Sequence, residues 1–156
     1  MLRHDDIALR IPHQGRMCLL ERVVQWNVER IHCKAISHRA SDNPLRAQGR
    51  LGIACGIEYA AQAMALHGAL IGEAAGGNLA PPRVGYLASV RSVILHASRL
   101  DDVEGDLTVS AERLMGDAGN IVYSFEVAAG ERPLLSGRAT VVLAPSMSAR
   151  LGRHNS

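Results

Sequence analysis

The sequence predicts an α+β fold in which an antiparallel six-stranded sheet wraps around one long central helix, with a short helix at the N-terminus. The stretch from Gly52 to Glu73 consists mostly of small apolar residues and is typical of a single helix. Two β-rich runs come before this stretch and four come after it, separated by turn residues. A long helix of small side chains needs a concave surface to pack against, and a curling sheet supplies one.

The elements before the central helix follow from local signals. Asp5 and Asp6 mark the start of a short helix, and Pro12 ends the turn that follows. Apolar residues then alternate from Leu20 to Cys33 around an Asn-containing bend at residues 26–29. This alternation predicts a hairpin of two strands.

Loop and turn residues divide the rest of the chain. The Ser, Asn, Pro and Gly content of residues 38–50 predicts a loop before the central helix. The four later runs are expected to be consecutive antiparallel strands, at residues 83–98, 106–116, 120–129 and 132–144. This order of elements is that of the hotdog fold, in which the sheet is the bun and the helix is the sausage.

Length and composition favour one ordinary globular domain. The chain has 156 residues, of which 47% are hydrophobic and 21% are charged. We expect a single hotdog domain over residues 1–145. Residues 146–156 lack a periodic apolar pattern, so we expect a flexible tail there.

The charge and aromatic content argue against a nucleic-acid-binding protein. The net charge is only +2, and the 16 arginines are spread along the chain without a cluster. A single Phe and a single Trp leave no aromatic platform on which bases would stack. Scattered arginines favour salt bridges or an acidic protein partner.

Cysteine spacing and hydropathy indicate a cytoplasmic protein. The three cysteines form neither a metal motif nor a disulfide framework, so we expect a reducing compartment and no metal. The N-terminus lacks the continuous apolar core of a signal peptide. The longest apolar stretch, residues 51–71, is interrupted by Glu58, Gln62 and His67, so we expect no membrane-spanning helix.

Glu58 is an ionisable residue inside the apolar helix. Burying an unpaired carboxylate costs on the order of several kcal/mol, or forces it to hold a proton. Its neighbours three and four positions away are Ala54, Cys55, Ala61 and Gln62. The predicted surroundings are therefore apolar with one amide in reach. Glu58 lies at a solvent-lined crevice, is satisfied by a partner, or is used in chemistry.

Two motifs together resemble a known family. The stretch "IPHQGRMCLLERV" resembles the opening of the hotdog β-hydroxyacyl-acyl carrier protein dehydratases, with its Pro-His and Leu-Leu-x-Arg-Val residues. The stretch "GIEYAAQAMA" resembles their Glu-x-x-Ala-Gln segment on the central helix. Within that family the chain resembles the dehydratase-like proteins of aryl polyene lipid pathways, in which "LASVRSV" and "GRATVVL" also fit. The resemblance covers roughly residues 7–144.

The resemblance implies removal of water from a 3-hydroxyacyl thioester carried on the phosphopantetheine arm of acyl carrier protein, with no cofactor. In that family a histidine abstracts the α-proton, a helix carboxylate assists the leaving hydroxyl, and amides at the helix N-terminus hold the thioester oxygen. Glu58 matches the carboxylate, and an apolar setting would favour the protonated acid. Gly52 and Gly56, which begin the same helix, and Gln62 are expected to bind substrate. Gln62 either orients Glu58 or holds a neighbouring element.

The base departs from the family pattern. The family's histidine lies in a Gly-His-Phe-Pro segment about fourteen residues before the glutamate, and the same count from Glu58 reaches Pro44. His13, in the N-terminal motif, and His38, at the start of the loop, are the candidate bases, although each can instead be a structural histidine. His67 is more than two helical turns from Glu58, so we expect a packing or surface role for it.

The sequence thus predicts a hydro-lyase that dehydrates 3-hydroxyacyl chains on acyl carrier protein, in a fatty acid or aryl polyene type pathway, with Glu58 as the acid. Arginines in loops or at strand ends are candidates to meet the carrier: Arg46, Arg50 and Arg91. An exposed sheet edge is expected to drive a homodimer, a trimer of dimers, or an assembly with a related hotdog subunit, with sites at the interface. Two alternatives stay open. One is a hotdog thioesterase, which uses a helix carboxylate without this histidine, and the other is a catalytically silent subunit of a hetero-oligomeric dehydratase.

Overall fold

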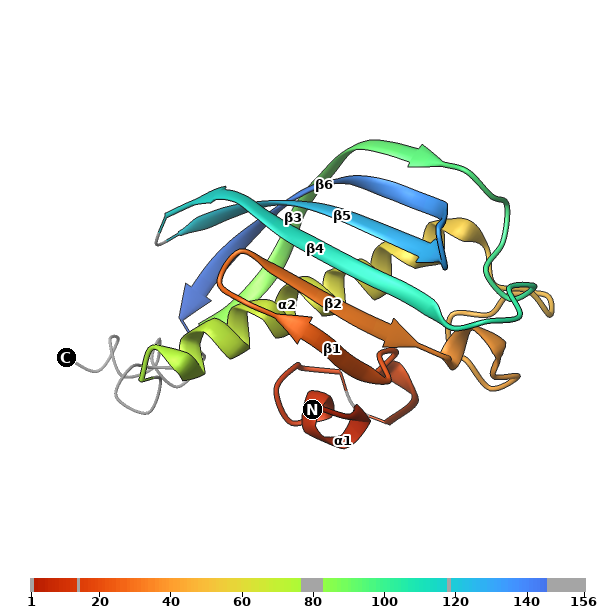
Figure 1. Ribbon diagram of the computed structural model, residues 1–156, viewed down its shortest axis with the longest axis horizontal. Coiled ribbons are helices and arrows are strands. Elements are labelled where there is room, and N and C mark those ends of the chain that lie inside the picture. The colour runs from red at the N-terminus through yellow and green to blue at the C-terminus, as the bar shows by residue number, and fades with distance from the viewer. Residues whose placement is uncertain (1, 14, 77–82, 118, 146–156) are drawn as a thin grey trace.

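A six-stranded antiparallel sheet curves over one long helix, as the sequence predicts (Figure 1). The computed structural model describes residues 2–13, 15–76, 83–117 and 119–145, and the expected tail at 146–156 lies outside them. The helices and strands are α1 (His4–Ala8), β1 (Arg22–Trp26), β2 (Arg30–Ala35), α2 (Gly56–Ala74), β3 (Arg83–Leu95), β4 (Leu107–Gly116), β5 (Asn120–Ala129) and β6 (Arg132–Pro145). Single 3₁₀ turns lie at Gly15–Met17, Ser37–Arg39 and Ile53–Cys55.

The strands pair in the order β1-β2-β4-β5-β6-β3, with every pair antiparallel. Strands β4, β5 and β6 form the expected meander, but β3 pairs with β6 rather than with β4. A bridge between Arg3 and Arg22 partly covers the β1 edge. Strand β3 forms the other edge, and no strand in the described part of the chain pairs with its outer side.

The hairpin of β1 and β2 turns where the sequence predicts it. The side-chain oxygen of Asn27 accepts hydrogen bonds from the backbone N–H groups of Glu29 at 2.8 Å and Arg30 at 2.9 Å. Asn is favoured in tight turns because its short side chain bonds the backbone two residues on.

Helix α2 packs one side against the concave face of the sheet. Its α-helical part begins at Gly56 rather than at Gly52, because residues 53–55 form a 3₁₀ turn first. A Cβ atom at Gly56 would lie 2.4 Å from Cδ2 of Leu135 on β6, so the absent side chain lets helix and sheet approach closely. No helix in the described residues is long and apolar enough to cross a membrane.

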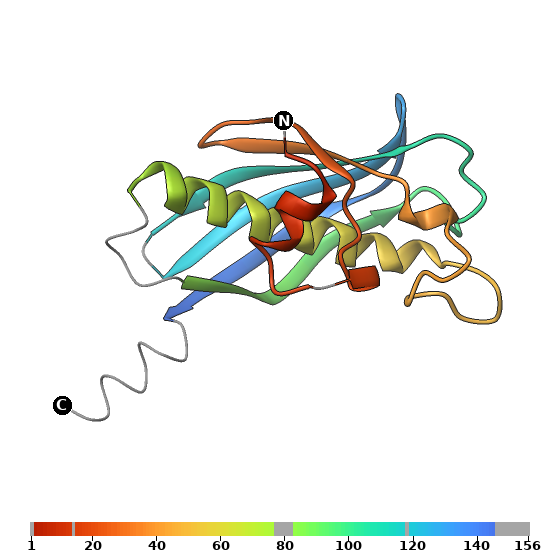
Figure 2. The ribbon, with the colours of Figure 1, turned by 90° about the horizontal axis from the view of Figure 1, so that it is seen from below.

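The N-terminal segment crosses α2 on the side away from the sheet (Figure 2). The Gln62 side chain holds it there, because Oε1 accepts from the N–H of Leu19 at 2.8 Å and Nε2 donates to the carbonyl of Met17 at 2.6 Å. Near the other end of the helix, Arg10 and Glu73 form an ion pair at 3.0 Å. Part of the central helix thus lies between the sheet and the N-terminal residues Arg10, Met17 and Leu19.

Candidate active site

Glu58 lies in the first turn of α2 and is exposed. It forms no hydrogen bond or ion pair with any residue that the structure describes, so within a single chain no partner satisfies it. The expected apolar enclosure is also not formed by a single chain, because Ala54 and Ala61 lie on the side of the helix that faces away from the sheet and are exposed or half-buried. The carboxylate is close enough to Cys55 to add to the rise in that thiol's pKa, which burial dominates.

Gln62 follows the second of its two expected roles. Both ends of its amide are bonded to the backbone of residues 17–19, and it makes no bond to Glu58. The side chain is fully buried. Gln62 therefore fixes the segment after His13 against α2, one helical turn beyond Glu58.

In sequence, His13 lies between Arg10, which pairs with Glu73 on α2, and residues 17–19, which Gln62 holds. The residue is half-buried, and its Nδ1 atom is buried without a hydrogen-bond partner among the described residues. An unpaired ring nitrogen is uncommon in a folded protein, where buried polar atoms are normally bonded. His13 therefore belongs to the stretch of chain that crosses the helix of Glu58, between the contacts that this helix makes with Arg10 and with Met17.

His38 shares one feature with His13, since its Nδ1 is also buried without a hydrogen-bond partner among the described residues, but it lies deeper in the protein. It is fully buried, and its Nε2 lies 3.1 Å from the carbonyl of Val103 and 3.0 Å from that of Gly105. Since carbonyl oxygens only accept, Nε2 carries the proton and ties the loop after β2 to the loop before β4. Burial lowers the pKa of His38.

The two glycines expected to bind substrate face different ways. Gly56 faces the sheet, where Leu135, Val127 and Leu100 surround it. Gly52 is open, since an added Cβ would meet no atom within 4 Å. Its carbonyl accepts from Cys55 at 3.0 Å, and its N–H meets no acceptor in the part of the chain that is described. The Gly52 amide is therefore available to a ligand at the start of the helix.

Arg46 organises the loop that precedes α2. Its guanidinium donates to three backbone carbonyls, those of Ala40 at 2.8 Å, Gly49 at 3.1 Å and His38 at 3.3 Å. Those hydrogen bonds leave it little freedom to meet a partner. Arg50 and Arg91, the other two candidates for the carrier, are exposed.

Sequence reasoning did not find a buried network next to Glu58. The hydroxyl of Tyr59 lies 2.8 Å from Oγ of Ser37 and accepts from Nδ2 of Asn43 at 3.1 Å. Burial raises the pKa of Tyr59. The network joins α2 to both ends of the loop at residues 37–43. The sequence signal that could have predicted it was the single Tyr among the small residues of the helix.

His67 has the packing role expected for it. It is fully buried, with Nδ1 at 2.8 Å from the Tyr123 hydroxyl and Nε2 at 2.7 Å from the carbonyl of Asn27. Burial raises the pKa of Tyr123 to about 12. The cluster fastens the second half of α2 to β5 and to the β1–β2 turn.

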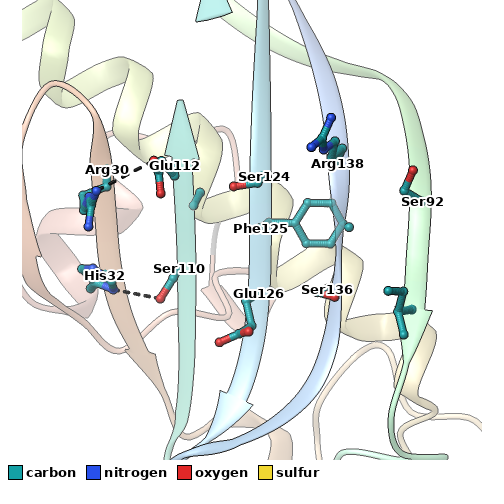
Figure 3. Close-up of a pocket in the computed structure, with 13 residues that line it drawn as sticks. Arg30, His32, Ser92, Ser110, Glu112, Ser124, Phe125, Glu126, Ser136 and Arg138 are labelled. Atoms are coloured by element: carbon teal, nitrogen blue, oxygen red, sulfur yellow. Dashed lines mark hydrogen bonds and ion pairs between the residues drawn. The ribbon is translucent and has the colours of Figure 1, made fainter. Parts of the chain in front are cut away.

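A hollow lies on the outer face of the sheet, on the opposite side from α2 (Figure 3). It has a volume of about 510 Å³, and none of the predicted site residues lines it. A second hollow of about 320 Å³ lies beside Cys18 and Leu19 and also excludes Glu58. No group of three or more His, Cys, Asp or Glu side chains in the described residues is arranged to hold a metal ion. A single chain therefore offers a carboxylate and a free amide without an enclosed pocket around them.

The chain matches one known protein family over nearly its whole length. The model of the ApeP-like family, described as ApeP dehydratase, matches residues 5–151. No curated protein matches significantly.

Solved structures share the fold. The ApeI:P dehydratase heterocomplex from Xenorhabdus doucetiae matches with a TM-score of 0.78 and 21% identity, covering 100% of this chain and 99% of that one. A thioesterase from Haemophilus influenzae matches with a TM-score of 0.65 and 11% identity, covering 94% of both chains. A thioesterase from Staphylococcus aureus has a TM-score of 0.59 and 15% identity over 80% of this chain and 93% of its own. At these identities the likeness establishes the hotdog fold.

Proposed function

Because the chain belongs to the ApeP-like dehydratase family, we propose that it dehydrates 3-hydroxyacyl thioesters carried on acyl carrier protein, in an aryl polyene or related fatty acid pathway. The observation that carries this proposal is the exposed Glu58 at the start of α2, which has no partner among the described residues and lies on the helix that the N-terminal segment crosses. Family membership gives the reaction class, and the geometry nominates the residues.

The proposed reaction needs one base and one acid. A ring nitrogen of His13 takes the proton from the α-carbon, and the electron pair left behind moves onto the thioester carbonyl. When that pair returns to form the carbon–carbon double bond, the bond to the 3-hydroxyl breaks and protonated Glu58 gives its proton to the departing oxygen. Water leaves, and exchange with solvent returns the proton from His13 to Glu58. Acid and base groups of this kind each contribute about 10²–10⁴-fold in rate.

The enolate intermediate needs a hydrogen-bond donor. The free N–H of Gly52 precedes the helix, where the positive end of the helix dipole also lies. Oriented donors at a developing negative charge are commonly the largest catalytic contribution. Gly52 is therefore the proposed donor to the thioester oxygen, and Gly56 has the packing role that its contact with Leu135 explains.

His13 is the preferred base because His38 is not accessible. His38 has no exposed surface, and its Nε2 is occupied by two carbonyl groups. An acyl thioester would have to displace both loops to reach it. His13 is only half-buried and lies on the segment that packs on the helix of Glu58.

A second hotdog subunit completes the proposed site. Acid–base chemistry on a thioester works best where water is excluded, and Glu58 is exposed in a single chain. The free edge of β3 offers unpaired backbone groups along 13 residues for strand addition. The heterocomplex of the similar X. doucetiae protein supports an assembly of two related subunits. Exposed Arg50, two residues before Gly52, is the proposed contact for the phosphate of the carrier arm, in a cytoplasmic setting.

The test is dehydration of a 3-hydroxyacyl-acyl carrier protein, followed by the mass of the carrier. The assay uses the purified chain alone and the chain co-purified with any hotdog subunit encoded beside it. Glu58→Gln is expected to lower the rate by about 10²–10⁴-fold. Glu73→Gln, on the last turn of the same helix, is the matched control and should retain full activity. Full activity of Glu58→Gln in an active assembly would overturn the role of Glu58.

The same samples separate the rival functions. A thioesterase would release free thiol from the acyl carrier without loss of water, as the hotdog neighbours from H. influenzae and S. aureus give reason to check. A silent subunit would show no dehydration alone, and its Glu58→Gln variant would leave the partnered activity unchanged. His13→Ala should reduce dehydration as far as Glu58→Gln does if the two groups act in one step.

A further inference from the structure

Two arginines lie directly opposite each other at the edge of the sheet. Arg91 on β3 is the register partner of Arg138 on β6. Side chains directly opposite on antiparallel strands point to the same face, with Cβ atoms about 4.5–5.5 Å apart, and like charges in such a pair repel. Both residues are exposed. Neither forms an ion pair with a carboxylate of any described residue, so two positive charges stand together without compensation.

The neighbouring strands do not supply a counter-charge. Ser124 lies opposite Arg138 on β5, at the same level in Figure 3. Glu112, further across the outer face, is paired with Arg30 at 3.8 Å. Glu126 lies opposite Ser136 in the next row, and it pairs with neither of the two arginines. The positive charge therefore remains at the β3 side of the sheet.

This charge lies at the edge where another strand would add. A strand pairing along the outer side of β3 would place one of its side chains directly opposite Arg91. A second copy of this chain has no carboxylate to offer there, since neither Arg83–Leu95 nor Arg132–Pro145 contains Asp or Glu. Antiparallel self-pairing of β3 centred near Arg91 would instead bring two further arginines to the same small region.

We propose that the edge of β3 disfavours a second copy of this chain and selects a different hotdog subunit, whose edge strand carries Asp or Glu facing Arg91 and Arg138. This inference rests on the proposed function only in assuming that a partner strand completes the assembly. Repulsion against the wrong partner and attraction to the right one together give the selectivity. The charge pair thus encodes which chain joins the sheet.

The experiment uses a charge-reversed variant of this chain as the acidic partner. Wild type is mixed with the double variant Arg91→Glu/Arg138→Glu, and native mass spectrometry gives the fractions of the three possible dimers. At low salt the ratio of the mixed dimer to either homodimer is expected to exceed its statistical value several-fold. Raising the salt to about 0.5 M screens the charges and should return the mixture toward the statistical ratio.

A matched variant controls for net charge. Arg16→Glu/Arg50→Glu changes the net charge by the same amount at exposed residues outside the sheet, and its mixture with wild type should stay near the statistical ratio. Tight wild-type homodimers at low salt, together with a statistical mixture for Arg91→Glu/Arg138→Glu, would overturn the proposal.

A milder variant keeps the test decisive if the double variant does not fold. Arg91→Gln removes one charge of the pair, and it should tighten self-association several-fold in sedimentation equilibrium. Unchanged self-association of Arg91→Gln would contradict the proposal. Both readouts are masses rather than rates, so loss of dehydratase activity in Glu58→Gln and failure of this charge selection are separate results.

Discussion

Two ionisable side chains on the same helix have opposite surroundings. His67 faces the sheet, is fully buried, and has both ring nitrogens bonded. Glu58, more than two turns earlier, is exposed and unpaired among the described residues. On the sheet side, the fold satisfies the polar groups that it buries, as native proteins normally do. The unpaired carboxylate on the other side contributes little to folding and is available for chemistry or for a partner.

Replacement of His67 is expected to give the largest loss of stability. His67→Leu leaves the buried hydroxyl of Tyr123 without its partner, which alone costs about 1–3 kcal/mol. Loss of the bond to Asn27 adds to this by freeing the β1–β2 turn from the helix. Urea unfolding of the two proteins gives the difference in unfolding free energy.

A second substitution tests whether the unpaired hydroxyl causes the loss. Adding Tyr123→Phe to His67→Leu removes both polar partners, and such double removal can be nearly neutral. The double variant should therefore recover much of the stability that His67→Leu loses. A double variant less stable than His67→Leu would show that packing, not the hydrogen bond, dominates at this position.

Substitution of two glycines of α2 tests the difference between the side of the helix that faces the sheet and the side that faces away from it. Gly56→Ala places a Cβ 2.4 Å from Leu135 in the core, and overpacking of this kind costs about 1–3 kcal/mol. Gly68→Ala meets no atom within 4 Å and should stabilise the helix by about 0.5–1 kcal/mol. Thermal melts of both variants should shift in opposite directions, and equal shifts would contradict the assigned orientation of the helix.

Local sequence signals were enough to predict most of the fold. Alternation and turn residues predict the hairpin around Asn27, and small apolar residues predict the central helix. The place of β3 beside β6 was not predictable in the same way. It depends on contacts between residues far apart in sequence, such as Val93 and Phe125 on either side of Gly137. Strand order is decided by such long-range packing, which periodicity does not encode.

The candidate site was predictable only in part, for a related reason. Glu58 stands within a helix motif, so its place in the chain is visible in the sequence. The partners of Gln62, Arg46 and His38 are backbone groups of irregular segments. The conformation of a loop follows no period, so the sequence does not show which carbonyl will face a given side chain. The two buried networks are findings of the structure for that reason.

Acidic pH is expected to lower the stability that the buried histidines His67 and His38 contribute. Burial lowers the pKa of His67, the nearby charge of Arg113 lowers it further, and the bond to the Asn27 carbonyl partly opposes both. Burial likewise lowers the pKa of His38, which faces two carbonyls between Arg39 and Asp106. In the unfolded chain each histidine regains a pKa near 6.5. Between the lowered pKa and about pH 6.5 the unfolded state therefore binds more protons than the folded state.

The stability that these histidines contribute is complete above about pH 6.5 and is lost as the pH falls through their lowered pKa values. Melting temperatures measured from about pH 7.5 down to about pH 5 should fall across this window. The variant with His67→Leu and Tyr123→Phe should show a shallower fall, since only His38 then contributes. A flat profile for the wild type over the same range would contradict the role given to both buried rings.

The smallest expected effect concerns Glu58 itself. Glu58→Gln removes an exposed carboxylate that has no described partner, and only its interaction with the helix dipole is lost, at about 0.3–1 kcal/mol. Glu73→Gln should cost a similar small amount, because it breaks an exposed ion pair with Arg10. Urea unfolding of single chains measures both. A loss above about 2 kcal/mol for Glu58→Gln would mean that the carboxylate holds the fold together, and its effect on turnover would then no longer identify it as the acid. A small loss of unfolding free energy combined with a large fall in the dehydration rate would show that Glu58 acts in chemistry rather than in folding. The same test is not possible at His67, because its replacement also destabilises the fold.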